Sequence, residues 1–374
     1  MPGVARFWRK ARHGSFEWGL WLAPLILMAI GLAVLYGTSL SGQSNSLPLY
    51  AKQLLWIVIG LLLGGVVAAV DYRFWKHLTF VMYVGSIVLL IGVLLFGTII
   101  QGHKSWFVFG GVSFQPVEWV KVALVITLSH FFAATNAFRR RWWPAIASLL
   151  LVGIIVWLVL RQPDLGSSIV LISVWLALLI ARGLPTKQVV VFSTLAVIIA
   201  LSGWYGFLRD YQKQRIVSFI NPAADSRGAG YNVTQSTIAV GSGGLLGKGI
   251  GQGTQSQLRF LPVRTTDFIF AVVGEEMGFV GSLAVIALYG WLLWRLLVIA
   301  RNAVDDFGGF LATGVAAMFF AHGFINIGMN IGLVPVTGIP LPFVSYGGSS
   351  LTAYLIAIGL VQSVARVKAF GVKA

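Results

Sequence analysis

The stretch Phe307 to Ala365 decides the fold: FGGFLATGVAAMFFAHGFINIGMNIGLVPVTGIPLPFVSYGGSSLTAYLIAIGLVQSVA contains no Asp, Glu, Lys or Arg. A transmembrane helix needs about 20 predominantly apolar residues, so this stretch is long enough for two of them. The break falls at Pro335-Val336-Thr337-Gly338-Ile339-Pro340-Leu341-Pro342, where prolines and a glycine interrupt regular helix. The stretch therefore predicts a protein that crosses a membrane more than once.

The overall composition supports a membrane protein. Hydrophobic residues make up 57% of the chain and charged residues 10%, too few polar side chains to cover a surface in water. The net charge of +16 would suggest nucleic acid in a soluble chain, but in a membrane protein it marks loops that face anionic lipid. We expect the lipid bilayer, and no nucleic acid, as a partner. The absence of cysteine excludes disulfides and thiol catalysis.

Apolar runs predict an all-α polytopic membrane protein of about ten transmembrane helices, in one membrane domain over residues 1–374. The runs are Trp18–Tyr36, Leu54–Val70, Leu78–Ile100, Val122–Phe138, Trp142–Leu160, Leu165–Ala181, Gln188–Leu208, Met277–Trp294, Phe310–Leu333 and Ser345–Ala365. The one large loop, about residues 209–266, lies between the seventh and eighth helices.

Basic residues predict the orientation of these helices. Lys and Arg concentrate at both ends of the chain and at every second gap, as in Arg139-Arg140-Arg141. Because cytoplasmic loops carry the excess of Lys and Arg, both termini should be cytoplasmic and the large loop outside.

Acidic residues gather on the opposite side. Those that map to outer loops or outer helix ends are Glu118, Asp164, Asp210, Asp225, Asp267, Glu275 and Glu276. Basic residues map there too, among them Lys104, Lys121, Arg161, Arg215, Arg259 and Arg264. The pattern fits either an ordinary wetted loop or a polar functional site at the outer surface.

Four of these residues suggest specific roles. Glu118 and Lys121 are i,i+3 neighbours at the start of a helix, and they form either an ion pair that seats the helix end or a functional pair. Asp164 follows Pro163 and could simply cap the next helix. Asp267 lies between a polar loop and an apolar run, where partial desolvation would raise its pKa toward that of a general base; the alternative is an N-cap.

The glycine-rich segment Gly241 to Gly253 does not match a nucleotide-binding loop. Gly247-Lys248 is followed by Gly249 rather than by Ser or Thr, and the predicted location faces away from ATP. Flexible backbone near a ligand, or a turn-rich re-entrant segment, explains it better.

Motifs from the fourth helix to the last resemble those of the SEDS (shape, elongation, division, sporulation) family. They are Gln115-Pro116-x-Glu118, Gln162-Pro163-Asp164-Leu165-Gly166, Tyr211-Gln212-x-Gln214-Arg215, Gly230-Tyr231-Asn232-x-x-Gln235-Ser236, Gly241-Ser242-Gly243-Gly244-x-x-Gly247-Lys248-Gly249, Thr254-Gln255-Ser256-Gln257, Phe260-Leu261-Pro262, Thr266-Asp267-Phe268-Ile269-Phe270 and Pro335 to Ser350. The segment Ile339 to Val344 is closer to the elongation branch of this family than to the division branch. The chain departs from the family pattern at two places. It has Ser105-Trp106 beside Lys104 where the family has Arg-Trp, and it has Val263-Arg264-Thr265 before Thr266-Asp267 where the family usually has Glu-Arg-His.

The resemblance implies a peptidoglycan glycosyltransferase in the bacterial cytoplasmic membrane. Such an enzyme polymerises lipid II at the outer face and pairs with a class B penicillin-binding protein, a transpeptidase. The family's catalytic Asp falls on Asp267, and its important Glu and Lys fall on Glu118 and Lys121.

The chemistry of this reaction needs a carboxylate base, cations beside the departing pyrophosphate and a groove for polyprenyl chains. Asp267 would be the base, while Lys121, Arg215, Arg259, Lys104 and Arg161, together with Asp164, would surround the lipid-linked substrate. A divalent cation, Mg²⁺ or Mn²⁺, could bridge a carboxylate and the pyrophosphate.

Two other functions compete with this hypothesis. A lipid II transporter would hold ionisable groups near the bilayer midplane and show an inverted repeat. A scaffold that only activates a transpeptidase would not require Asp267.

The predicted orientation can be tested by labelling introduced cysteines, because the chain has none of its own. An impermeant thiol reagent applied to intact cells should label Ser226→Cys in the large loop and leave Thr186→Cys unlabelled. Labelling of Ser226→Cys only after permeabilisation would overturn the orientation.

Overall fold

The computed structural model describes residues 16–40, 47–100, 103–110, 112–138, 140–183, 185, 187–188, 190–192, 194, 210–221, 228–258, 260–261 and 263–367. Its long helices are α2 (Trp18–Ser39), α3 (Leu49–Ala69), α4 (Trp75–Phe96), α5 (Pro116–Ala134), α6 (Trp143–Arg161), α7 (Leu165–Ala181), α12 (Ile269–Arg301), α13 (Asp306–Asn330) and α14 (Gly348–Arg366). Between α7 and α12 lie α9 (Asp210–Ile220), α10 (Ala229–Ser242) and α11 (Thr254–Gln257). Short 3₁₀ turns are η1 (Tyr72–Phe74) and η2 (Asn136–Phe138).

The predicted polytopic helical class is confirmed. Among the described residues, 8 helices are long and apolar enough to cross a membrane, and the shorter α7 is a further apolar helix. The predicted seventh span, Gln188–Leu208, lies mostly outside the described residues. The fourth helix begins at Pro116, ahead of the apolar run Val122–Phe138, which agrees with the expectation that Glu118 and Lys121 lie at the start of a helix.

Three short strands were not predicted from the sequence. β1 (Thr98–Ile100), β2 (His103–Phe109) and β3 (Val112–Phe114) form an antiparallel sheet in the order β1-β2-β3, between α4 and α5. In the register of this sheet Ile99 pairs with Lys104 and Phe107 with Phe114. Strands as short as β1 and β3 offer too little alternation of side chains to be recognised in a sequence.

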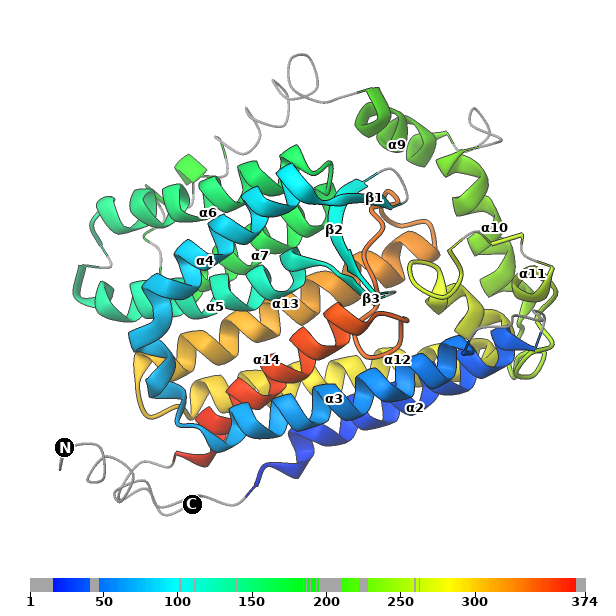
Figure 1. The fold of residues 1–374 in the computed structure, drawn as a ribbon, viewed down its shortest axis with the longest axis horizontal. Helices are drawn as coiled ribbons and strands as arrows, with labels where there is room; N and C mark the ends of the chain where they lie inside the picture. The colour runs from blue at the N-terminus through cyan, green and yellow to red at the C-terminus, as the bar shows by residue number, and fades with distance from the viewer. Residues whose placement is uncertain are drawn as a thin grey trace.

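Helix α13 is the centre of the bundle. It packs against α12, α7, α5 and α14, and α14 in turn packs along α3 (Figure 1). Glycines permit α14 and α3 to approach closely: a Cβ added at Gly359 of α14 would lie 2.2 Å from the carbonyl oxygen of Gly64 in α3. Small residues at helix contacts are typical of membrane bundles, where dispersion between closely packed backbones drives association.

Helix α12 is broken at Gly278, whose backbone has φ +66°. The glycine-rich turn after α10 pairs with the broken backbone. The amides of Lys248 and Gly249 donate to the carbonyls of Glu275 and Glu276, each at 3.0 Å. The amides of Phe279 and Val280 donate back to carbonyls of the turn, at 2.9 and 3.1 Å.

This pairing explains why the turn is rich in glycine. At Gly247, with φ +81°, an added Cβ would lie 2.2 Å from the carbonyl oxygen of Glu276, so only glycine allows this approach. The segment therefore serves as closely packed backbone beside the break in α12. In Figure 1, α9, α10 and α11 lie together at one end of the bundle.

Candidate active site

Asp267 lies just before α12, in a loop whose main chain accepts hydrogen bonds from side chains of α13. The Nδ2 atoms of Asn326 and Asn330 donate to the main-chain carbonyl of Asp267 at 2.9 and 3.0 Å. The hydroxyl of Thr266 donates to Asp267 Oδ1 at 2.9 Å. The N-cap of α12 is Phe268 and no side chain caps this helix, so the carboxylate of Asp267 is not used as a cap.

The surroundings of Asp267 change its acidity. Burial raises the pKa of the carboxyl from 3.8 to about 6, and the hydrogen bond from Thr266 and the positive charge of Arg215 lower it less than burial raises it. The negative charge of Asp164 raises the pKa further. A carboxylate with a pKa near 6 is ionised at neutral pH and is basic enough to accept a proton in a reaction.

Two further predicted residues, Arg215 and Asp164, lie near this carboxylate. Arg215 of α9 donates from Nη1 to the carbonyl of Thr337 at 3.4 Å. Asp164 caps α7 by accepting from the amide of Ser167 at 2.9 Å, so its capping role is real. A Cβ added at Gly338, where φ is +78°, would lie 3.4 Å from Asp267 Oδ2. The proline-rich segment between α13 and α14 thus lies directly against the candidate base.

A cavity of about 810 Å³ opens beside this site and runs between α7, α12 and α13. Its lining is almost entirely apolar, with Arg215 and Thr337 among the few polar contributors. The lining residues on α7 extend from Leu165 to Ile180, which at 1.5 Å per residue is about 22 Å of helix. The cavity therefore offers a long apolar surface, and its lining includes the guanidinium whose charge acts on Asp267.

Glu118 and Lys121 form a fully buried ion pair. Lys121 Nζ lies 2.7 Å from Glu118 Oε1, and the side chains are 1% and 2% exposed. The same ammonium contacts His322 Nε2 of α13 at 2.9 Å. The pair therefore lies in the interior of the bundle and does not anchor the helix end at the protein surface.

Helix α13 carries a polar face that the sequence analysis missed. His322, Asn326 and Asn330 follow one another at intervals of four residues and are 0% exposed. This i, i+4, i+8 spacing places them on one face of the helix, where the first contacts Lys121 and the other two hold Asp267. The sequence signal that could have revealed this face is the repeat of polar residues at every fourth position within the charge-free stretch.

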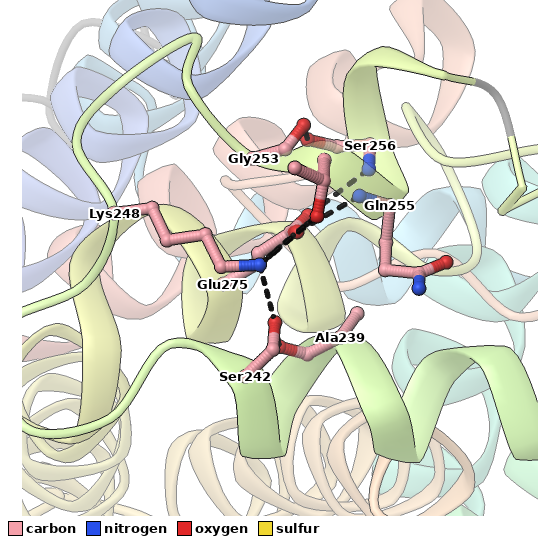
Figure 2. Close-up of polar contacts among 8 residues, drawn as sticks. Ala239, Ser242, Lys248, Gly253, Gln255, Ser256 and Glu275 are labelled. Atoms are coloured by element: carbon pink, nitrogen blue, oxygen red, sulfur yellow. Dashed lines mark hydrogen bonds and ion pairs between the residues drawn. The ribbon is translucent and has the colours of Figure 1, made fainter.

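Glu275 is a further buried carboxylate, and several groups donate hydrogen bonds to it (Figure 2). It accepts from the backbone amides of Gln255 at 2.8 Å and Ser256 at 3.0 Å, and pairs with Lys248 Nζ at 3.0 Å. Lys248 also donates to the hydroxyl of Ser242 at 2.8 Å. The cluster joins α10, α11 and α12, so it ties the large loop to the helix that follows Asp267.

The remaining predicted cations have other contacts. Lys104 of β2 donates to the carbonyl of Leu95 at 3.0 Å. The guanidinium of Arg161 lies 4.9 Å from the ring centre of Trp157. Neither contact involves Asp267. Arg259 lies outside the described residues.

Comparison with known proteins identifies the relatives of this chain. The model of the cell cycle protein family of FtsW, RodA and SpoVE matches residues 17–369. The chain is 38% identical over 365 residues to the peptidoglycan glycosyltransferase MrdB of Escherichia coli, covering 97% of this chain and 96% of that protein. It is 33% identical over 425 residues to the peptidoglycan glycosyltransferase RodA of Treponema pallidum, covering 94% and 97%.

Solved structures agree with these sequence relatives. A chain from a peptidoglycan synthase complex, described as coordinating polymerization and crosslinking, superposes with a TM-score of 0.80 at 32% identity, covering 94% of this chain and 98% of that one. The rod shape determining protein RodA of Thermus thermophilus gives a TM-score of 0.70 at 30% identity, covering 94% and 97%.

The buried Glu118–Lys121 pair predicts a specific pattern of variants. Glu118→Ala or Lys121→Ala leaves one charge buried without its counter-charge, at a cost of about 3 to 5 kcal/mol in comparable pairs. Thermal unfolding of the purified protein should show this loss. The double variant Glu118→Gln with Lys121→Met should recover most of the stability and little of the activity. Single Ala variants as stable as wild type would contradict the assignment.

Proposed function

This chain belongs to the FtsW, RodA and SpoVE family of cell cycle proteins, and from that premise we propose that it polymerises lipid II into glycan strands. It is a peptidoglycan glycosyltransferase and a multi-pass protein of the bacterial inner membrane. The choice of substrate rests on Asp267 and Arg215: the carboxylate has a raised pKa, and the guanidinium whose charge acts on it also lines a long apolar cavity. A base, a cation and a lipid-sized groove match a sugar carried on a polyprenyl pyrophosphate.

The proposed reaction forms one bond and breaks one. The 4-hydroxyl oxygen of the acceptor sugar attacks the anomeric carbon of the donor, and the bond from that carbon to the pyrophosphate breaks. Asp267 accepts the hydroxyl proton, and the electron pair leaves with the polyprenyl pyrophosphate. The backbone hydrogen bonds from Asn326 and Asn330 hold the loop of Asp267 in place during this step.

Arg215 is the described cation best placed for the leaving group. Its charge acts on Asp267, and its side chain lines the cavity. A guanidinium binds phosphate oxygens through several N–H groups, so it would stabilise the negative charge that develops on the pyrophosphate. Lys121 is 1% exposed and is held by Glu118 and His322, which supports a positioning role for it in this conformation.

The cavity would hold the polyprenyl chain. Its apolar lining from α7, α12 and α13 offers no charge along its length except that of Arg215. An isoprenoid chain buried there gains roughly 25 cal/mol for each Å² of apolar surface removed from contact with water. The pyrophosphate of the same molecule would then lie at the end where Arg215 and Asp267 are found.

A divalent cation remains part of the proposal. Mg²⁺ is commonly held by one or two carboxylates together with substrate phosphates. Asp164 and Asp267 are near enough for the charge of one to change the pKa of the other, so these two carboxylates could hold such an ion with the pyrophosphate. Among the described residues, no group of three or more His, Asp or Glu forms a metal site of protein ligands alone. When bound, the ion would neutralise negative charge on the leaving group.

We propose a transpeptidase as partner. The similar chain of known structure belongs to a complex that combines polymerization and crosslinking, and crosslinking is the chemistry of a transpeptidase. The identification of that partner as a class B penicillin-binding protein rests on the family resemblance.

Removal of the base should abolish polymerisation. Asp267→Asn keeps the size of the side chain, while general-base catalysis is worth about 10² to 10⁴ in rate. Purified wild type and Asp267→Asn, at equal folded concentration, are incubated with labelled lipid II and the glycan products are separated by length. We expect polymer from wild type only.

Two controls complete this experiment. Asp267→Glu should retain little activity, because one added methylene moves the carboxylate by about 1 Å from its productive position. Folding of each variant is checked by thermal unfolding. Equal polymer from wild type and Asp267→Asn would refute the assignment, and lipid II transport without polymer by wild type would favour the transporter.

The pH dependence of polymerisation follows from the raised pKa of Asp267. The ionised carboxylate is the base, so kcat/KM should fall as pH decreases through about 6, well above the ordinary carboxyl value near 4. Arg215→Gln removes a positive charge that lowers this pKa, so the acid limb should move to higher pH. An acid limb near pH 4 in wild type would contradict the prediction.

A further inference from the structure

The hydrogen bonds of His322 define the protonation of its ring. Nδ1 lies 2.7 Å from the carbonyl oxygen of Met318, which can only accept, so Nδ1 carries a hydrogen. Nε2 lies 2.9 Å from the ammonium of Lys121, which can only donate, so Nε2 carries none. The ring is therefore neutral and presents a lone pair to Lys121.

We propose that His322 is a positioning residue that holds the ammonium of Lys121 in line with Glu118 and couples this pair to Asp267 through α13. The proposal rests on the proposed function, because it assigns His322 a role in polymerisation. The ammonium of Lys121 lies at the end of a flexible stem of four carbons. Glu118, one turn away on the same helix, restrains this ammonium from one side only. His322 adds a second restraint from a different helix.

The ring of His322 is itself held in place. The imidazole is 0% exposed, and its centre lies 5.3 Å from that of the Tyr354 ring of α14 at an interplanar angle of 71°. Together with the bond to the Met318 carbonyl, this contact fixes the direction of the Nε2 lone pair. The ammonium of Lys121 is thus located by three helices, α5, α13 and α14.

The same face of α13 determines where Asp267 lies. Asn326 is four residues after His322 and Asn330 four residues later, so each step is about 6 Å along the helix. Both amides bind the main-chain carbonyl of Asp267. Asn330 Oδ1 also accepts from the amide of Ala271 at 3.0 Å, which joins α13 to the first turn of α12. One rigid helix therefore sets the separation between the ion pair and the base.

Charge explains why a neutral acceptor is required at position 322. Glu118 and Lys121 balance each other, and a second cation at 2.9 Å from the ammonium would be repelled in the dry interior. An apolar residue would leave one ammonium N–H without its partner. A neutral side chain with a lone pair avoids repulsion of the ammonium and accepts a hydrogen bond from it.

The test compares His322→Gln, which retains a neutral acceptor, with His322→Leu, which has none. Polymer formation from labelled lipid II is measured as kcat and KM at equal folded concentration. Loss of a hydrogen bond to a charged group should lower kcat by about 10- to 100-fold in His322→Leu with little change in KM. The kcat of His322→Gln should stay within about 3-fold of wild type, a smaller change than the loss expected for His322→Leu. In the Lys121→Met background, His322→Leu should cause no further loss of stability.

Two activity results would overturn the proposal: His322→Leu as active as wild type, or His322→Gln and His322→Leu impaired equally while both remain folded. Stability in the Lys121→Met background adds a test, since a further loss there would show that His322 acts independently of Lys121.

A spectroscopic measurement separates this proposal from the proposed function. In protein labelled with ¹⁵N-histidine, the resonances absent from His322→Gln belong to His322. They should show a neutral ring with the hydrogen on Nδ1, and Lys121→Met should shift the Nε2 resonance. A hydrogen on Nε2 would overturn the proposal. If wild-type protein makes no polymer while the resonances are as expected, the proposed function fails and the contact between His322 and Lys121 stands.

Discussion

The lack of water inside a membrane bundle requires the backbone amides and carbonyls to find partners within the protein. The break of α12 at Gly278 shows the constraint most directly. Carbonyls of Glu275 and Glu276 and amides of Phe279 and Val280 lose their helical partners, and the glycine-rich turn supplies four replacements. The large loop is therefore attached to the bundle by backbone hydrogen bonds, and the cluster around Glu275 strengthens the attachment.

The candidate site combines carboxylates in different electrostatic states. Glu118 has a cation at 2.7 Å, whereas Asp267 has one hydroxyl donor and a more distant guanidinium that only partly compensate its burial. A paired carboxylate is suited to holding structure, while a poorly compensated one gains proton affinity. The polar face of α13 joins the two, so the positions of base and ion pair depend on a single helix. This arrangement places the candidate base at one end of α13 and the buried ion pair further along the same helix.

Much of the fold could be predicted because apolar length alone identifies a helix that crosses a bilayer. Hydropathy alone placed the fourth apolar run at Val122–Phe138, and the start of the helix followed instead from the proline and the charged residues before that run, where the structure begins α5 at Pro116. The short strands gave no periodic signal. Asp267, Arg215 and Asp164 were predicted and do lie close together, whereas His322, Asn326 and Asn330 were missed.

The sequence by itself determined the membrane class, most of the helices and the identity of the candidate base, because these follow from apolar length and from local motifs. Only the tertiary structure decided which groups are buried and which groups meet. Lys121 and His322 are 201 positions apart in the chain, and no local pattern predicts their contact at 2.9 Å. The same holds for Asn330 and the carbonyl of Asp267, 63 positions apart. Partners at such separations are chosen by the packing of helices, which brings distant residues together and removes the water that would otherwise satisfy them.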